Sequence, residues 1–280
     1  MRTARFAAAA LLLPVAAALT ACGGAADPAP ARSAERTPQQ VLVAAAEVMK
    51  RAGGAEVELR GGELRWAGPV VWAPKPAMEL ARSDGRRLKV VDGAAYAGGP
   101  GVAEISRGKA WQRLDGPVEG LKDLRAGRVD PLGLGTVLML REQLDPAAGL
   151  ALAAKEEAVT RVGAEQLDGA AATHYRVEAP GGLYLGDPAL SQDNRRTLAE
   201  QLQRARVARV VIDYWVNDRD ELLKRTESGN GAAGAATAEI RYRGLGVRAD
   251  VSAPPPGDVA GLMDLLPTAV PATTPATEES

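Results

Sequence analysis

The chain contains a single cysteine, Cys22, among its 280 residues. Cys22 follows two arginines, Arg2 and Arg5, and a short apolar run that ends with Leu19 to Ala21. A charged start, a short apolar middle and small residues before a cut are typical of an export signal, and the run is too short to remain as a membrane-spanning helix. An exported domain without disulfides must be held together by its hydrophobic core, and this chain is long enough to build one.

The sequence Leu19-Thr20-Ala21-Cys22 resembles the lipobox of bacterial lipoproteins. The resemblance implies that a diacylglyceryl group is attached to the Cys22 thiol, with acyl groups such as palmitate, and that a signal peptidase cuts between Ala21 and Cys22. Two or more acyl chains anchor a protein stably, whereas one chain binds a membrane only marginally. We therefore expect a protein anchored to the outer, extracytoplasmic face of the cell membrane. The alternative is an ordinary secretory signal that happens to contain a cysteine.

Composition limits the classes of function. Hydrophobic residues make up 46% of the chain and aromatic residues only 4%, so leucine, valine and four tryptophans must form the core. Removal of Arg2 and Arg5 with the signal changes the net charge from −1 to −3, with 32 basic against 35 acidic residues. No block of basic residues stands out, so the sequence does not favour a nucleic-acid partner.

The chain divides by composition into four segments. A lipoprotein signal peptide covers 1–21, and the lipidated cysteine with a flexible tether covers 22–36. One folded domain covers 37–264, and a disordered C-terminal tail covers 265–280. The tether and the tail are rich in alanine, proline and charged or hydroxyl residues without periodicity, which is typical of disordered segments.

The first part of the domain is predicted to be one helix followed by a meander of strands. An N-cap at Thr37, a proline at the first helical position and apolar residues at helical spacing predict a helix over 38–51, which Gly53 ends. Alternating apolar residues between 57 and 114 then predict short antiparallel strands. Among them, Asp92-Gly93 is predicted to be the turn of a two-residue hairpin.

The middle and the last part differ in pattern. Asp130-Pro131 and Asp145-Pro146 each predict the start of a helix, and the first helix is apolar over more than one face. Strands are predicted to return after 159, with a hairpin turn at Asp168-Gly169 and a charged surface helix over 193–206. The last predicted strand contains Val247, Ala249 and Val251.

These elements predict an α+β fold, since antiparallel strands occur in blocks and do not alternate with helices. Helices can cover one face of such a sheet, and an apolar cavity results if the sheet curls and the helices fail to fill its concave side. The predicted lining combines the four tryptophans with the over-apolar middle helix. These candidates are Trp66, Trp72, Trp111, Leu134, Val137, Leu138, Met139 and Trp215.

The order of the elements resembles the actinobacterial LppX/LprG-type lipoproteins. The local matches are Val159 to Gly163 with Asp168-Gly169, then Thr173 to Val177, then Ile212 to Val216 with its polar turn. The resemblance implies a curved antiparallel sheet, the half-barrel of the LolA/LolB lipoprotein carriers, with helices covering the concave face. It also implies that the domain holds acyl chains of a lipid or glycolipid.

Catalytic and metal-binding patterns are weak. His174 is the only histidine and lies within a predicted strand, without a cysteine or a Gly-x-Ser-x-Gly sequence to pair with it as a nucleophile. The carboxylates Asp213, Asp218 and Asp220 surround a predicted hairpin turn, where aspartate favours turn geometry over cation binding. Two adjacent acids at 156 and 157 point to opposite faces of a strand, and the glycines between 229 and 234 are predicted to form a flexible loop. We therefore expect no enzyme, no metal and no cofactor.

Two functions remain open at this stage. The preferred one is a monomeric, membrane-anchored lipoprotein that binds or carries a lipid or acyl-chain ligand in a half-barrel cavity. The alternative is an envelope interaction or scaffold lipoprotein that has no lipid cargo. A hydrolase is the weakest hypothesis, because no catalytic constellation is visible.

Overall fold

The computed structural model describes residues 35–62, 64–113, 145–188, 192–232 and 234–260. The helices and strands of these described ranges belong to the unit that begins at Arg36. Cys22 with the lipobox, the tail after 264 and the apolar segment 130–144 lie outside the described residues. Within the described ranges, no helix has both the length and the apolarity needed to cross a membrane.

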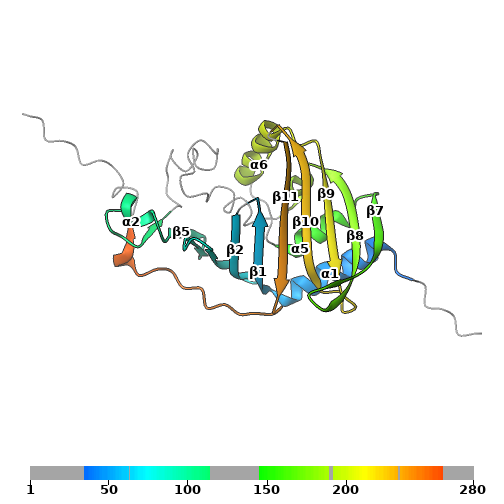
Figure 1. Ribbon diagram of the computed structural model, residues 1–280, viewed down its shortest axis with the longest axis horizontal. Coiled ribbons are helices and arrows are strands. Elements are labelled where there is room, and N and C mark those ends of the chain that lie inside the picture. Colours follow the sequence, from blue (N-terminus) through cyan, green and yellow to red (C-terminus); the bar gives the residue numbers. More distant parts are fainter. Residues whose placement is uncertain (1–34, 63, 114–144, 189–191, 233, 261–280) are drawn as a thin grey trace, which may run out of the picture. The chain divides into compact units, whose positions relative to one another are not determined.

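Twelve strands form one sheet that is not closed into a barrel (Figure 1). Their bounds are β1 Gly54–Gly61, β2 Leu64–Val71, β3 Ala77–Arg82, β4 Arg87–Val91, β5 Ala94–Gly98, β6 Trp111–Arg113, β7 Val159–Leu167, β8 Ala170–Pro180, β9 Arg209–Val216, β10 Leu222–Gly231, β11 Gly234–Arg243 and β12 Val259–Ala260. Their order is β12-β6-β5-β4-β3-β2-β1-β11-β10-β9-β8-β7. All neighbours are antiparallel except β12 and β6, which confirms the predicted antiparallel meander.

The sheet has two halves, each built from neighbours in sequence. Strands β1 to β6 form the first half and strands β7 to β11 form the second. The ladder between β1 and β11 joins them, with Leu59 opposite Ile240. This long-range pairing makes one sheet from two meanders.

Helix α1 (Pro38–Ala52) is fixed at both ends by its own sequence. The Thr37 hydroxyl accepts a hydrogen bond from the Gln40 backbone amide at 3.2 Å, and the Gln40 side chain accepts one from the Thr37 amide at 2.9 Å. This reciprocal capping box satisfies two amides that the first turn leaves unpaired. At the other end Gly53 takes the left-handed conformation with φ 70°, which glycine adopts without steric cost.

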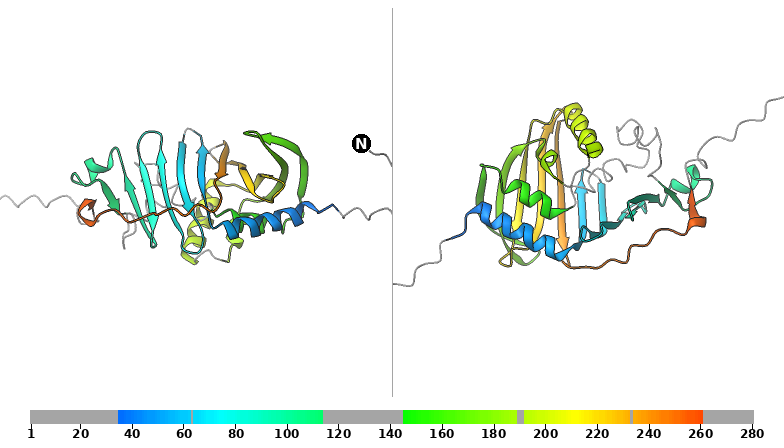
Figure 2. Two further views of the ribbon diagram at one scale, coloured as in Figure 1. Left: turned by 90° about the horizontal axis from the view of Figure 1, so that it is seen from below. Right: turned by 180° about the vertical axis from the view of Figure 1, so that it is seen from behind.

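Helix α5 (Pro146–Ala153) starts as its Asp-Pro sequence predicts. The Asp145 carboxylate accepts hydrogen bonds from the amides of Ala147 and Ala148 at 2.9 and 3.4 Å. Burial raises the pKa of Asp145, and these two amides partly oppose that effect. Helices α1 and α5 pack against each other, and strands β7 to β11 curl around them (Figure 2). The prediction that helices cover the concave face of a curved sheet is confirmed.

One large core lies between these helices and the inner face of the sheet. It buries Leu42 and Met49 of α1, Leu150 of α5, and large side chains from both halves of the sheet. Each fully buried leucine of this kind stabilises the fold by about 1.5–3 kcal/mol. The helix predicted over 38–51 therefore contributes the face that holds the two halves together.

A second, smaller core covers the opposite face of strands β4 to β6. It contains Val91, Ala94, Tyr96 and Trp111, against which Val251 and Val259 pack. The covering residues come from the segment after β11, which returns along the sheet to β12. This segment corrects one prediction, because residues 247–251 form no strand, and Val251 packs against the smaller core as part of an extended segment.

The turn chemistry was predicted well, with one exception. Asp92-Gly93 and Asp168-Gly169 both have positive φ at their two turn residues, as two-residue hairpins require. The glycines between 229 and 234 are not a simple loop. β10 continues to Gly231 and β11 begins at Gly234, so the hairpin is longer than the sequence indicated.

Candidate functional site

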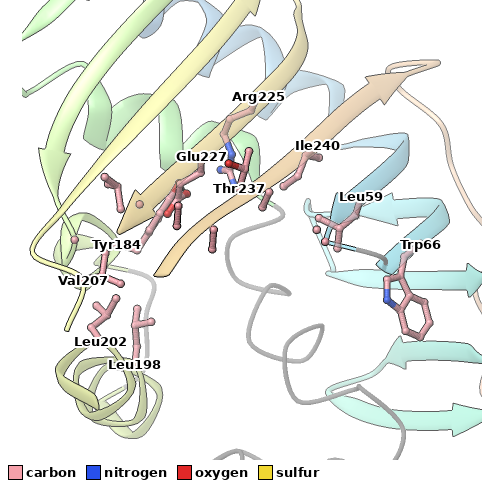
Figure 3. A pocket seen from close by; sticks show the side chains of 18 residues that line it. Leu59, Trp66, Tyr184, Leu198, Leu202, Val207, Arg225, Glu227, Thr237 and Ile240 are labelled. Atoms are coloured by element: carbon pink, nitrogen blue, oxygen red, sulfur yellow. The ribbon is translucent and has the colours of Figure 1, made fainter. Parts of the chain in front are cut away.

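A pocket of about 650 Å³ opens on the inner face of the sheet (Figure 3). Its walls come from β1, β2, β9, β10 and β11, from the 3₁₀ helix η1 (Leu183–Gly186), and from helix α6 (Gln192–Ala205). Most of the lining is apolar or small. The lining residues are Leu59, Gly61, Gly62, Trp66, Gly181, Tyr184, Leu198, Leu202, Val207, Val210, Arg225, Glu227, Gly229, Ala235, Ala236, Thr237, Ala238 and Ile240.

The pocket exists because side chains on the inner face become small toward one end of the strands. Leu59 and Ile240 form a pair of large side chains across β1 and β11. Two residues further along each strand, Gly61 is opposite Ala238, and the lost volume is not replaced. A Cβ atom built on Gly61 would meet nothing within 4 Å. The sheet is therefore close-packed beside α1 and open at the other end.

The opposite wall is helix α6, which the sequence predicted as a charged surface helix. Leu198 and Leu202 lie four residues apart on one stripe, and Val207 follows the helix. All three are half-buried, and Leu198 and Val207 also pack against the edge of the large core. The apolar stripe of α6 thus covers the pocket without filling it.

Among the described residues that line the pocket, Arg225 is the one basic side chain, and it is 2% exposed. A β-bulge in β10, where the register shifts between Leu222 and Lys224, sets its direction. After the bulge, Lys224 pairs with Trp215 on the outer face, and Arg225 pairs with Tyr214 on the inner face. The bulge therefore turns a positive charge into an apolar pocket.

The guanidinium of Arg225 has little neutralisation within the described chain. Its Nη1 atom has no hydrogen-bond partner there, and no carboxylate of the described residues lies within 4.0 Å as an ion-pair partner. The neighbouring ring of Tyr184 lies 5.7 Å from the guanidinium carbon. Arginine stays protonated in proteins, so the buried charge is permanent.

Three tyrosines surround Arg225, and all three are neutral at physiological pH. Burial raises the pKa of Tyr242 to about 12, and it also raises the pKa values of Tyr184 and Tyr214. Tyr214 donates a hydrogen bond to the Gly149 carbonyl of α5 at 3.4 Å. A Cβ on Gly149 would lie 3.2 Å from Arg225 Nη1, so the glycine lets α5 pass beside the guanidinium.

Glu227 is the acid closest to Arg225 along β10, two residues further on the same face. Its carboxylate accepts a hydrogen bond from the Tyr184 hydroxyl at 3.1 Å. Figure 3 shows Arg225 and Glu227 of β10 and Thr237 of β11 projecting into the pocket. The polar groups of the pocket therefore gather at its β10–β11 wall, and the remaining lining is apolar.

Of the eight predicted lining residues, Trp66 lines this pocket. It is 1% exposed, and its Nε1 atom has no hydrogen-bond partner among the described residues. The guanidinium of Arg82 lies 5.7 Å from its ring. Leu134, Val137, Leu138 and Met139 lie outside the described residues.

The other three tryptophans lie elsewhere. Trp72 donates its Nε1 hydrogen to the Met49 carbonyl at 2.9 Å and so joins the end of α1 to the sheet. Trp111 belongs to the smaller core, with the Arg87 guanidinium 4.5 Å from its ring. Trp215 points to the outer face of β9 because it is one residue out of phase with Tyr214 and Val216. Predicting all four as one lining was wrong for this pocket, since strand phase separates them.

His174 lies on the outer face of β8, between two acids. Its Nδ1 is 2.9 Å from Glu165 Oε1, its Nε2 is 2.7 Å from Asp213 Oδ1, and its ring stacks on Trp215 at 4.3 Å. Both ring nitrogens are thus engaged with neighbouring side chains. This geometry ties β7, β8 and β9 together and leaves no ring nitrogen directed at a pocket.

The three aspartates predicted around a turn have separate roles. Asp213 accepts hydrogen bonds from Arg176 and His174, and Asp220 accepts two from Arg36 at 2.8 and 2.9 Å. Asp218 is exposed in the turn that follows β9. Within the described ranges, no three His, Cys, Asp or Glu residues are arranged to hold a metal ion.

Sequence reasoning missed Arg225, Tyr184, Glu227 and the leucines of α6 as pocket residues. Alternation alone cannot assign Arg225, because the bulge shifts the phase of β10 by one residue. Tyr184 lies in the segment between β8 and α6, where no periodicity indicates the direction of its side chain. The apolar stripe of α6 was visible, but the surface that it faces was not.

No protein-family model matches this chain. A Streptomyces griseus protein, described as an uncharacterized 31.2 kDa protein in the rplA-rplJ intergenic region, is 27% identical over 172 residues, covering 60% of this chain and 53% of that protein. A Streptomyces coelicolor protein named as a putative lipoprotein is 30% identical over 169 residues, covering 60% of this chain and 48% of that protein. The chain thus spans about half the length of the curated relatives that it matches.

Solved structures with a similar fold include two mycobacterial proteins. LprF from Mycobacterium bovis has a TM-score of 0.48 and 14% identity, covering 78% of this chain and 96% of that one. The lipoprotein LppX from Mycobacterium tuberculosis has a TM-score of 0.43 and 11% identity, covering 75% of this chain and 98% of that one.

Proposed function

We propose that this chain is an extracytoplasmic lipoprotein, anchored to the membrane through Cys22, that binds an acyl-chain ligand in the pocket between the sheet and α6. The observation that carries the binding function is the pocket itself, about 650 Å³ with a mainly apolar lining. Ligand pockets commonly measure about 300–1,000 Å³ and combine apolar walls with a few polar groups. This pocket has both properties.

The anchor is supported by sequence. Leu19-Thr20-Ala21-Cys22 resembles a lipobox, and the Streptomyces coelicolor relative is itself named as a putative lipoprotein. Cys22→Ser removes the thiol that would be acylated. The variant should leave the detergent-soluble lipoprotein fraction, and acylated protein persisting in that variant would contradict the anchor.

The binding function is tested by filling the pocket. The mature chain carrying Cys22→Ser is purified, and its organic extract is analysed by mass spectrometry for acyl-chain compounds. Ala238→Phe places a large side chain on the inner face beside Gly61, so it should remove the extracted ligand. Ala67→Phe is the matched control, because Ala67 is exposed and alternates with Trp66 on β2.

The control should extract with as much ligand as the parent protein. A parent protein that yields no acyl-chain compound, and that binds none when the compound is added, would refute the binding function. If both variants lose the extracted ligand equally, the loss results from disturbance of the sheet and not from filling of the pocket.

A further inference from the structure

Arg225 poses an energetic problem that the folded chain does not solve by itself. A buried charge without a partner costs several kcal/mol, and buried charges in proteins are usually paired and hydrogen-bonded. Arg225 is 2% exposed, and its Nη1 atom has no hydrogen-bond partner within the residues that the structure describes. Burial opposes the charge of Arg225, whereas the three tyrosines and the Glu227 carboxylate favour it and raise the pKa of Arg225. The tyrosines are neutral, and Glu227 forms no ion pair with Arg225 within 4.0 Å, so no carboxylate of the described residues contacts the guanidinium directly. The arrangement therefore calls for an anion from outside the described chain.

The position of Arg225 indicates where that anion would lie. Arg225 lines the pocket in one cross-strand row with Ile240 of β11, Leu59 of β1 and Trp66 of β2. Neighbouring strands lie about 4.8 Å apart, so an apolar track of roughly 14 Å runs from Arg225 to Trp66. A charge at one end of an apolar track matches an amphiphile with a single chain.

The volume sets the size of this amphiphile. A water-sized group takes about 30 Å³, so a pocket of about 650 Å³ holds roughly 20 such groups. That number is sufficient for one long acyl chain with its head group.

Glu227 narrows the choice of head group. Its carboxylate lies on the same face of β10, two residues from Arg225, and is the only acid in the described pocket lining. A phosphate monoester carries nearly two negative charges and would be repelled more strongly by Glu227 than a carboxylate would. A carboxylate can also accept two parallel hydrogen bonds from a guanidinium.

We infer that the pocket binds a long-chain carboxylate with its head group inward on Arg225 and its chain along Ile240 and Leu59 toward Trp66. This inference rests on the proposed function, since it requires that the pocket bind an acyl chain. It adds the charge, the number of chains and the orientation of the ligand. The head group lies within the pocket and not at its mouth.

The test compares an acid with its neutral ester. The mature chain carrying Cys22→Ser is stripped of lipid, and its dissociation constants for palmitate, methyl palmitate and palmitoyl lysophosphatidate are measured by calorimetry. Palmitate should bind at least about tenfold more tightly than its ester, because a hydrogen bond to a charged group is commonly worth a factor of ten or more. It should also bind more tightly than the lysophosphatidate.

Two variants test whether the side chains of Arg225 and Glu227 cause the difference in affinity between palmitate and its ester. Arg225→Met should weaken palmitate binding about tenfold or more and leave the ester unchanged. Glu227→Gln should strengthen palmitate binding a few-fold, because it removes the competing negative charge. Circular dichroism and thermal unfolding establish that each variant is folded.

One readout is independent of the variants. Palmitate labelled with ¹³C at its carboxyl carbon reports ionisation by its NMR shift. Bound to the parent protein, the carboxyl should remain ionised below about pH 4, where an unperturbed carboxyl protonates. A bound carboxyl that titrates like a free one would contradict its contact with Arg225.

The outcomes separate the two proposals. Equal affinity for acid and ester, unchanged in Arg225→Met, would overturn the head-group inference while chain binding stands. Tighter binding of the lysophosphatidate would overturn the choice of a carboxylate. Binding of none of the three compounds would overturn both proposals.

Discussion

Lys224 and Arg225 are neighbours on β10 with the same charge and opposite surroundings. Lys224 faces outward, with its Nζ 3.6 Å from the Trp215 ring and 4.0 Å from a carboxylate oxygen of Glu239. Arg225 faces inward, where its Nη1 has no hydrogen-bond partner in the described chain. The same sheet thus carries directly paired charges on its outer face and, on its inner face, a charge without a direct ion-pair partner among the described residues. We infer from this comparison that the charges on the outer face stabilise the fold, whereas the charge on the inner face is available to bind an anionic ligand.

The outer face shows what full compensation looks like. Asp213 accepts from Arg176 and lies 2.7 Å from His174 Nε2, and Glu165 accepts from Trp215 and lies 2.9 Å from His174 Nδ1. Arg241 donates to Glu239 and to Asp168, at 2.8 and 2.9 Å. Together with the contacts of Lys224 to Trp215 and Glu239, they connect β7 to β11 through side chains. Such a network explains a lone histidine without any catalytic role.

The largest expected effect comes from breaking the outer network at Asp213, which is 7% exposed. Asp213→Ala should lower the free energy of unfolding by about 2–4 kcal/mol, because the buried His174 loses one of its two partners and the exposed Arg176 loses its acceptor. Urea denaturation at neutral pH measures this change. Asp218→Ala in the exposed turn is the control and should change stability little.

The loss of stability in Asp213→Ala should also depend on pH. Burial tends to raise the pKa of Asp213, but hydrogen bonds from Arg176 and His174 outweigh it, so the folded-state pKa is below its ordinary value near 3.8. A carboxyl with a lowered pKa stabilises the fold above its unfolded pKa, and this contribution is lost as the pH falls through the folded pKa. The stability difference between parent and Asp213→Ala should therefore shrink below about pH 4. A constant difference down to pH 2 would contradict this explanation.

On the inner face, we expect the removal of a charge to raise the free energy of unfolding. Arg225→Met replaces a buried charge without a direct ion-pair partner by an apolar side chain of similar length, and should raise the free energy of unfolding of the lipid-free protein by about 1–3 kcal/mol. The matched change on the outer face, Arg241→Met, should lower it. If Arg225→Met destabilises the lipid-free protein, the inner charge is already compensated and the contrast between the faces fails.

The smallest effect belongs to Lys224. Lys224→Met should cost only about 0.5–1 kcal/mol, because it removes one cation–π contact and one long ion pair at the surface of the sheet. The Lys224→Met variant should bind palmitate as tightly as the parent protein does. Its affinity is measured by the same calorimetric titration that is used for Arg225→Met. A loss of affinity comparable to that of Arg225→Met would mean that net charge, and not the inward position, determines binding.

The sequence predicted local structure far better than the pocket. Thr37, Asp145 and the two Asp-Gly turns act within a few residues, so their helix starts and hairpins could be predicted directly. The antiparallel sheet and the covering helices also followed from periodicity and resemblance. The pocket depends instead on Gly61 lying opposite Ala238, a pairing across the two halves that no local pattern reveals.

The tryptophans teach the same lesson. By residue type alone, the four tryptophans were equal candidates for the pocket lining. Strand phase and position place only Trp66 among the described lining residues. Arg225 was not predicted as a pocket residue, because a charged residue in a strand is expected to face water. Only the bulge in β10 turns it inward, and a bulge has no reliable signature in a single sequence.

The ladder between β1 and β11 has a kinetic consequence. Leu59 and Ile240 pair across about 180 residues of chain, and contacts of such long range form slowly because the loop must close before they stabilise anything. Helix α1 and the local hairpins can form earlier, from residues that are close in sequence. The pocket has walls on both strands, so it is completed only when the two meanders meet. Ligand binding during refolding should thus report the final docking step, later than the recovery of most secondary structure.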